Sequence, residues 1–295
     1  MLVPTTPAVL IDYMDITNRF KWLLRLYNWN TPHLFLDISA NYTTHFLRVG
    51  AVIVIRNWLA YFVDYFKPTK GKRVVYTLRN DVKIETRSGT VDKEIIDEIW
   101  IDRSYTPRDF EIDKEDTIVD IGAHIGVFSI FASQSASKGT VYAIEPIREN
   151  FEILKDNIEL NRIKNIIPVE IAISDKTGNK EIFLGDTGMH SFYFDRGNNK
   201  ISTRTISFKD FVEQNEISKI DLLKMDCEGA EYEILFGCPE DILKLIRRIT
   251  LEYHNIDDAR NALSIKEFLE KRGFKVSCRI ATGDFLVIGH LYAKR

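Results

Sequence analysis

From residue 116 to the C-terminus, short apolar runs alternate with segments whose apolar residues recur at helical spacing. Such an alternation is typical of an α/β protein with a doubly wound, mostly parallel sheet. The predicted strands are residues 117–121, 140–145, 166–173, 220–226 and 248–254, and the predicted helices are residues 126–135, 149–161, 208–215, 230–236, 242–245 and 265–272.

Both flanks of this alternating region have β patterns. Downstream, residues 274–280 and 285–292 are separated by the turn sequence Ala281-Thr282-Gly283-Asp284 and predict a hairpin, so we expect an antiparallel last strand. Upstream, the pattern predicts a small β element with a turn at Asn80-Asp81. Its expected strands are residues 74–78, 82–86 and 95–101.

Residues 49–66 are the most apolar stretch of the chain and predict an amphipathic helix. Its uncharged runs, 49–55 and 57–63, are too short to span a bilayer, which takes about 18 residues. One sector of the helix is polar, and it contains Arg56, Asn57, Asp64 and Lys67. We expect the apolar face to pack on the protein's own core or on a second subunit in a homodimer, and contact with a membrane surface is the alternative.

Pro68 and Gly71 interrupt the helical pattern, so residues 67–72 have the character of a linker. We therefore place a domain boundary near residue 72. Residues 1–72 would form an N-terminal helical extension and residues 73–295 the main domain. Within the main domain, residues 73–115 are the β-rich lead-in and residues 116–295 the α/β core.

Composition narrows the classes of function. The 295 residues contain 40 Lys and Arg against 43 Asp and Glu, a net charge of -3, which disfavours sequence-independent binding to nucleic acid. The three cysteines fit neither a disulfide framework nor a zinc site, and the first 22 residues, with Asp12 and Asp15, lack the basic start and apolar stretch of a signal peptide. We expect a cytoplasmic protein, with peripheral membrane contact as an alternative.

The first chemical signal is the sequence Val119-Asp120-Ile121-Gly122-Ala123-His124-Ile125-Gly126, where a predicted strand turns into a predicted helix. Glycines at such a turn let the backbone approach a ligand. His124 and Val127 stand where a dinucleotide fingerprint has glycines, which disfavours a pyrophosphate site. Glu145, at the end of the next predicted strand, is placed to accept hydrogen bonds from both hydroxyls of a ribose. One ribose without a pyrophosphate fits S-adenosylmethionine.

Acidic residues mark the ends of two later predicted strands. Asp226 and Glu228 end the run that begins at residue 220, and the two-residue period places Glu252 and His254 on one side of the following strand. Parallel strands deliver their carboxyl ends to one crevice, so we expect these side chains to converge near the Gly122 turn.

Together, these motifs resemble the FkbM family of S-adenosylmethionine-dependent methyltransferases. The resemblance implies a Rossmann-like class I methyltransferase fold, with a seven-stranded sheet in the order 3-2-1-4-5-7-6. It also implies an O-methyltransferase that acts on a hydroxyl of a sugar, glycan, lipid-linked or natural-product acceptor. It runs from about Tyr76 to His254 and rests on V-D-I-G-A-H-I-G at 119–126, A-I-E-P at 143–146, D-N-I-E-L-N at 156–161, A-I-S-D at 172–175 and L-K-M-D-C-E-G-A-E at 223–231.

The resemblance also implies roles for single residues. Asp120, Gly122 and Ala123 would hold the methionine part of the cofactor, Glu145 would hold the ribose, and the strand end at 170–172 would border the adenine. Asp226 would lie near the transferable methyl group. His124 and Cys227 depart from the family pattern, which has Asn and a β-branched residue there. The cofactor-binding residues implied in this way are Asp120, Gly122, Ala123, His124, Gly126, Glu145, Pro146, Ala172 and Asp226.

Methyl transfer to a hydroxyl needs a group that accepts the hydroxyl proton. His254 is the first candidate, because imidazole titrates near neutral pH, and Asp226 is the second. Acceptor contacts are expected from His190, Ser191, Glu228 and Glu252. We expect no metal, although Asp226, Glu228, Glu252 and His254 are residue types that hold Mg²⁺.

Two other classes of function remain open. One is a non-catalytic S-adenosylmethionine-binding or membrane-docked partner protein of the same fold. The other, more distant, is a dinucleotide oxidoreductase, which the glycine spacing disfavours.

Overall fold

A computed structural model describes residues 51–183, 200–280 and 288–295 of the chain. The chain divides into two compact units, Met1–Thr44 and His45–Arg295, and all described residues belong to the second. The boundary expected near residue 72 therefore falls within this second unit.

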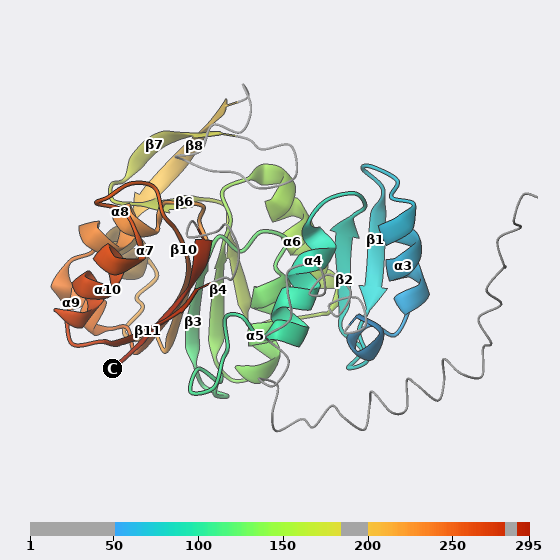
Figure 1. Cartoon of the computed structure of the whole chain (residues 1–295), viewed down its shortest axis with the longest axis horizontal. Helices are drawn as coiled ribbons and strands as arrows, with labels where there is room; N and C mark the ends of the chain where they lie inside the picture. Colours follow the sequence, from blue (N-terminus) through green and yellow to red (C-terminus); the bar gives the residue numbers. More distant parts are fainter. Residues whose placement is uncertain (1–50, 184–199, 281–287) are drawn as a thin grey trace, which may run out of the picture. The chain divides into compact units, whose positions relative to one another are not determined.

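The centre of the second unit is a seven-stranded sheet with the strand order β11-β12-β10-β9-β3-β4-β5 (Figure 1). All neighbouring strands are parallel except β12, which is antiparallel to both β10 and β11. In chain order this is the arrangement 3-2-1-4-5-7-6, so the expected fold and the antiparallel hairpin are confirmed. The strands are β3 (Thr117–Ile121), β4 (Thr140–Ile144), β5 (Ile166–Val169), β9 (Leu222–Met225), β10 (Arg248–His254), β11 (Lys275–Ile280) and β12 (Ile288–Lys294).

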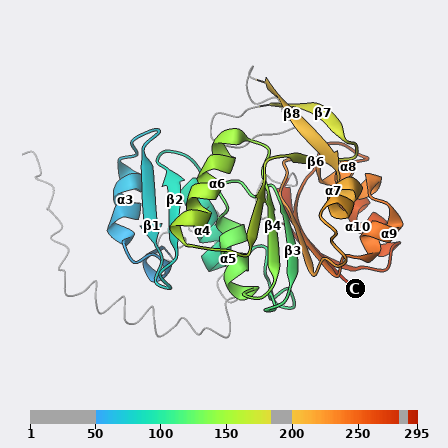
Figure 2. The same ribbon diagram turned by 180° about the vertical axis from the view of Figure 1, so that it is seen from behind.

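Helices cover both faces of this sheet, which explains why its strands are continuous apolar runs. Ile118 and Leu222 point into one core, whereas their neighbours Val119 and Leu223 point into the other. Figures 1 and 2 show α5 (Val127–Ser135) and α6 (Arg148–Leu160) on one side of the sheet. The other side carries α7 (Phe208–Gln214), α8 (Glu231–Gly237), α9 (Glu240–Lys244) and α10 (Ala262–Glu270).

A second, three-stranded sheet corrects one predicted strand. The run expected over residues 166–173 is split, because the chain bends after Val169 and the Ile171 N–H donates to the Val169 carbonyl. Only the first half belongs to the main sheet. The second half is β6 (Ala172–Ser174), which joins β8 (Lys200–Ser207) and β7 (Gly178–Phe183) in the order β6-β8-β7.

The lead-in contains the expected hairpin of β1 (Arg73–Thr77) and β2 (Lys83–Arg87), which lies against α6 (Figure 2). The strand expected over residues 95–101 was wrong, since this segment is helical: α4 (Asp92–Asp97) continues into a π-helix, η1 (Glu98–Asp102). The buried Ile96 and Ile99 are three residues apart, and this helical spacing places them on one face.

The amphipathic segment also differs from its prediction. Helix α3 begins at Trp58, because the carboxamide of Asn57 hydrogen-bonds to the Val75 carbonyl and the Thr77 N–H of β1. Asp64, expected on the polar outer sector, is 6% exposed and accepts hydrogen bonds from Tyr76 and Lys93. Asp64, the charged residue of α3 (Trp58–Phe66), therefore faces the protein. No helix in the described ranges combines the length and the apolar character that a membrane span requires.

Candidate cofactor and methyl-transfer site

A cleft of about 800 Å³ opens where β3, β4 and β9 end. Its lining combines apolar side chains with acidic and amide groups. The apolar lining includes Ile144, Ile147, Ile171, Ala172, Ile173 and Ile182, and the polar lining includes His124, Glu145, Asn150, Asp226 and Glu228.

The turn after β3 is held against two neighbouring strands. The N–H groups of Gly122 and Ala123 both donate to the carbonyl of Ile144, at 3.0 and 2.9 Å. Gly122 has a φ of +79°, and a Cβ at this position would overlap the carbonyl of Asp226. The turn therefore depends on glycine, and this glycine brings the turn into contact with the end of β9.

Gly126 serves a different contact. Its φ is +86°, and a Cβ there would overlap the side chain of Leu154 on α6. This glycine lets the start of α5 approach α6 closely, and it does not line the cleft. The cofactor role expected for Gly126 is therefore an indirect one in this geometry.

Glu145 lies in the wall of the cleft and is only 4% exposed. One carboxylate oxygen accepts the N–H of His124 at 2.9 Å, and the other accepts the N–H of Ile147 at 2.9 Å. Burial raises the pKa of this carboxyl to about 7, against the effect of the two N–H donors. Asn150 adds a long hydrogen bond of 3.4 Å to the oxygen that accepts the Ile147 N–H. Each oxygen thus has a lone pair that is free or only weakly engaged, and Glu145 can accept hydroxyl hydrogen bonds there.

Asp226 follows β9 and faces the cleft from the other side of the turn. Its carboxylate accepts a hydrogen bond from Tyr105 at 2.9 Å and lies 3.9 Å from the ammonium group of Lys224. Burial alone would raise the pKa of Asp226, but the positive charges of Lys224 and His254 and the Tyr105 hydroxyl lower it. Asp226 is therefore an ionised carboxylate at neutral pH.

Asp120 and Lys224 form an ion pair behind the turn. Their charged groups lie 3.1 Å apart, and Asp120 also accepts a hydrogen bond from Ser129 at 2.6 Å. Lys224 donates to the carbonyl of Gly122 at 2.9 Å. Asp120, expected to hold the cofactor, thus supports the turn from the interior and does not line the cleft.

The two predicted residues of β10 lie deeper than expected. Burial and the carboxylate of Asp226 raise the pKa of Glu252 to about 9, so Glu252 is protonated at neutral pH. His254 is 2% exposed and lies 3.6 Å from Glu228 and 3.5 Å from Glu231. Burial opposes its charge, but the carboxylates of Glu231 and Glu228 outweigh this effect and raise the pKa of His254 to about 10. A charged imidazole has no lone pair for a hydroxyl proton, so this geometry does not support the expected base.

The structure thus brings part of the predicted set together. Gly122, His124, Glu145, Pro146, Ala172, Asp226 and Glu228 line the cleft, whereas Asp120, Ala123, Gly126, Glu252 and His254 lie behind it. His190 and Ser191 are outside the described residues. Within the described ranges, no three His, Cys, Asp or Glu side chains are arranged to hold a metal ion.

The sequence prediction missed Tyr105 and Lys224, which both contact Asp226. A charged residue inside the otherwise apolar run Leu222–Met225 is a signal for a buried ion pair, and it identifies Lys224 in retrospect. Tyr105 has no comparable signal, since it reaches the site from 121 residues away along the chain.

Comparison with known proteins agrees with this geometry. The methyltransferase FkbM domain matches residues 120–276, more than half of the chain. The chain is 28% identical over 224 residues to 31-O-demethyl-FK506 methyltransferase FkbM of Streptomyces tacrolimicus, covering 65% of this chain and 84% of that protein. It is 26% identical over 144 residues to the hexuronic acid methyltransferase AglP of Haloferax volcanii, covering 49% of this chain and 58% of that protein.

A crystal structure of an FkbM methyltransferase from Methylobacillus flagellatus aligns with a TM-score of 0.45 and 19% identity, over 62% of this chain and 44% of that one. The cleft itself suits the methyl donor of such enzymes, because Glu145 can hold a diol and the apolar lining can hold a flat base. The protein is a methyltransferase whose cofactor is S-adenosylmethionine, and it belongs to the FkbM family.

Proposed function

We propose that this methyltransferase acts on a hydroxyl oxygen of a sugar, glycan, lipid-linked or natural-product acceptor. The observation that carries the proposal is the ionised carboxylate of Asp226, which lines the cleft beside the Gly122 turn. The names of two relatives support this acceptor class, since one refers to a hexuronic acid and the other to a demethylated FK506.

The cleft residues divide between the parts of the cofactor in this proposal. S-adenosylmethionine supplies a methyl group made electrophilic by the sulfonium sulfur. Glu145 accepts the ribose hydroxyls with its remaining lone pairs, and Ile147, Ala172 and Ile173 flank the adenine. The backbone of the Gly122 turn lies beneath the methionine part.

Asp226, rather than His254, accepts the hydroxyl proton in this proposal. A hydroxyl becomes strongly acidic as its oxygen forms the new bond to carbon, so a carboxylate of low pKa is a competent acceptor. Asp226 is ionised and faces the cleft, and the Tyr105 hydroxyl fixes its orientation. Glu228, which lines the cleft, is the described candidate for an acceptor contact, and His190 and Ser191 remain predictions.

Methyl transfer to a panel of sugar, glycan and lipid-linked hydroxyl acceptors tests the proposal. Asp226→Asn should lower kcat by about 10² to 10⁴-fold, the contribution of a positioned base. The neutral His254→Gln variant should keep a larger share of the activity. If His254→Gln instead loses more activity than Asp226→Asn, the base is His254 and not Asp226.

Cofactor binding, measured separately by calorimetry, distinguishes catalysis from the binding-protein alternative. Wild-type protein that binds S-adenosylmethionine but transfers no methyl group to any acceptor of the panel would favour a non-catalytic binding protein.

A further inference from the structure

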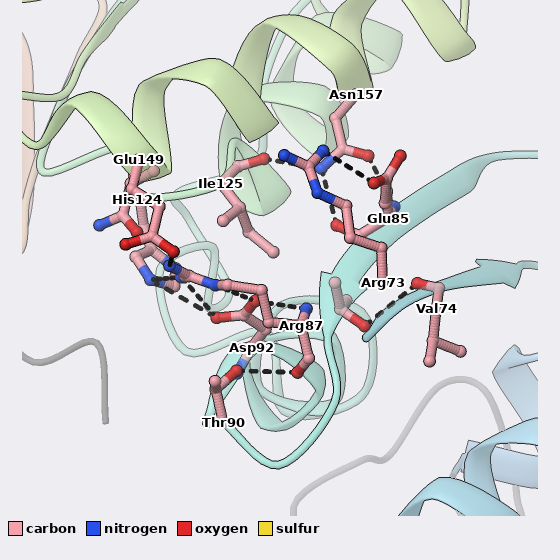
Figure 3. Close-up of polar contacts among 12 residues, drawn as sticks. Arg73, Val74, Glu85, Arg87, Thr90, Asp92, His124, Ile125, Glu149 and Asn157 are labelled. Atoms are coloured by element: carbon pink, nitrogen blue, oxygen red, sulfur yellow. Dashed lines mark hydrogen bonds and ion pairs between the residues drawn. The ribbon is translucent and has the colours of Figure 1, made fainter. Parts of the chain in front are cut away.

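The lead-in, which precedes the matched FkbM domain, builds part of the cofactor cleft. Val91 and Ile95 line the cleft from the segment around α4. Arg87, at the end of β2, and Asp92, at the start of α4, lie against His124 of the cofactor turn (Figure 3). Residues outside the domain match at 120–276 thus reach the turn that defines the site.

Arg87 and Asp92 form a two-pronged ion pair that leaves the guanidinium one orientation. Nε and Nη2 of Arg87 each donate to a different oxygen of Asp92, both at 2.9 Å, and the Arg87 N–H adds a third bond at 2.8 Å. The side chain of Asp92 is fully buried and that of Arg87 is 11% exposed. Thr90 closes the loop, because its hydroxyl bonds to the Arg87 carbonyl and the Asp92 N–H. A bidentate ion pair of this kind between arginine and a carboxylate is rigid and strong.

The contact between Arg87 and His124 determines the position of the imidazole proton. Nη2 of Arg87 lies 3.1 Å from Nε2 of His124. A guanidinium can only donate, so Nε2 must accept, and the ring proton then lies on Nδ1. The other charged groups here are Asp92, 3.6 Å from Nε2, Glu149, 4.0 Å from Arg87, and Glu145, which accepts the His124 N–H.

We propose that Arg87 is a positioning residue of the cofactor site, which holds His124 as the neutral imidazole with its proton on Nδ1. Asp92 in turn fixes Arg87. The tautomer gives position 124 one N–H donor, which replaces the amide donor of the Asn expected there in this family. The inference rests on the proposed contact between the Gly122 turn and the cofactor, although its first test needs no cofactor.

The direct test is the nitrogen NMR spectrum of the imidazoles in the full-length, cofactor-free protein at pH 8. The chain has six histidines, and the His124→Asn variant identifies the signals of His124. We expect the Nε2 shift of His124 in the unprotonated range and the Nδ1 shift in the protonated range. The opposite tautomer, or a doubly protonated ring, overturns the proposal whatever the cofactor affinity.

Variants then test the role of the contact. Arg87→Lys and the double variant Arg87→Gln/Asp92→Asn, which leaves no buried charge unpaired, should shift the His124 signals. Their affinity for S-adenosylmethionine at pH 8 should fall by about 2- to 12-fold, the equivalent of one hydrogen bond. Arg73→Lys is the matched control, because Arg73 lies on the same hairpin but pairs with Glu85 and Asp156, away from His124. An unchanged His124 spectrum in the folded Arg87 variants would also overturn the proposal.

A second inference comes from helix α3. Leu59, Val63 and Phe66 recur at helical spacing and are 63%, 63% and 69% exposed, so they form one outward apolar strip. The opposite side of α3 is fixed to the protein, since Tyr61 donates to Asp97 at 2.5 Å and Lys93 pairs with Asp64 at 3.0 Å. Turning the strip inward would leave the buried Asp64 without these partners, which is costly.

Basic residues follow the strip immediately. Lys67, Lys70 and Lys72 are all exposed, and none has an ion-pair partner among the described residues. An exposed apolar helix face beside several lysines is the combination that binds an anionic lipid surface, because the apolar side chains insert and the lysines meet the headgroups. We infer that the α3 strip docks this enzyme on an anionic membrane.

Flotation with vesicles tests this surface in the full-length protein. Binding is expected to vesicles rich in phosphatidylserine, to weaken in high salt, and to be absent with phosphatidylcholine alone. Val63→Glu and the triple variant Lys67→Gln/Lys70→Gln/Lys72→Gln should each reduce the bound fraction at least about fivefold, since each removes one of the two contributions. Leu263→Glu is the control, because Leu263 is 69% exposed on α10. Membrane docking would be contradicted if the protein bound to neither type of vesicle. It would also be contradicted if the protein were a dimer in solution that Val63→Glu dissociates.

Discussion

The carboxamide of Asn157 makes both hydrogen bonds that a neighbouring strand would give to Glu85. Its oxygen accepts the Glu85 N–H at 2.6 Å, and its nitrogen donates to the Glu85 carbonyl at 3.0 Å. Asn161 repeats this arrangement with Lys83, one helical turn later. Helix α6 therefore occupies the free edge of β2, an edge that would otherwise be open to other strands (Figure 3).

Asn157→Ala should lower the free energy of unfolding by about 2 to 4 kcal/mol. The side chain is fully buried and makes a third bond, to the Ile125 carbonyl, so its loss leaves several buried backbone groups unpaired. Asn161→Ala should cost less, because its contacts with β2 are exposed to water. Urea denaturation of the two variants measures the difference, and equal costs would contradict this explanation.

The affinity for S-adenosylmethionine should depend on pH through Glu145. Its pKa of about 7 means that the carboxylate becomes protonated as the pH falls below 7, and a protonated carboxyl accepts ribose hydroxyls poorly. Affinity should therefore be about tenfold lower at pH 6 than at pH 8. Calorimetry across this range measures the profile, and Glu145→Gln, which cannot titrate, should give a weaker and flatter one. A flat wild-type profile would exclude Glu145 as the titrating contact.

Substitution by alanine should have different effects at two glycines that have similar backbone angles. Gly122 and Gly273 have φ values of +79° and +86°, so both variants carry the backbone cost of the left-handed region, roughly 1 to 2 kcal/mol. Gly273 has open space around it, whereas a Cβ at Gly122 overlaps the Asp226 carbonyl. We expect Gly122→Ala to be the more destabilised protein in thermal unfolding and to lose cofactor binding, and Gly273→Ala to keep it.

Lys224→Met should destabilise the protein by about 3 to 5 kcal/mol, because it leaves the fully buried carboxylate of Asp120 without its cation. Adding Asp120→Asn removes the unpaired charge and should recover part of the loss. The recovery, measured by urea denaturation, separates a charge effect from a packing effect. A double variant no more stable than Lys224→Met would point to packing.

The sheet was predictable because its strands are buried on both faces, so each strand appears in the sequence as an apolar run that needs no partner to be recognised. The η1 segment was misread because its apolar pairs, at 95–96 and 99–100, suit either a short strand or a helix. The direction of α3 was misjudged because the contacts of Asp64 with Tyr76 and Lys93 come from outside the helix.

The cleft residues Gly122, Glu145 and Asp226 were predictable because each stands at a strand end within a recognisable motif. The state of His254 was not. The residue is where the strand pattern placed it, but its charge depends on Glu228 and Glu231, whose distance from the imidazole is set by the fold.

The docking of β2 on α6 also sets the smallest fragment that could fold on its own. A polypeptide beginning at Asp116 would still contain all seven strands of the main sheet. It would, however, present Asn157 and Asn161 to solvent and lack the side chains of Val91 and Ile95 from the wall of the cleft. We therefore expect the autonomous folding unit of this enzyme to include β2 and α4, upstream of the region by which its family is recognised.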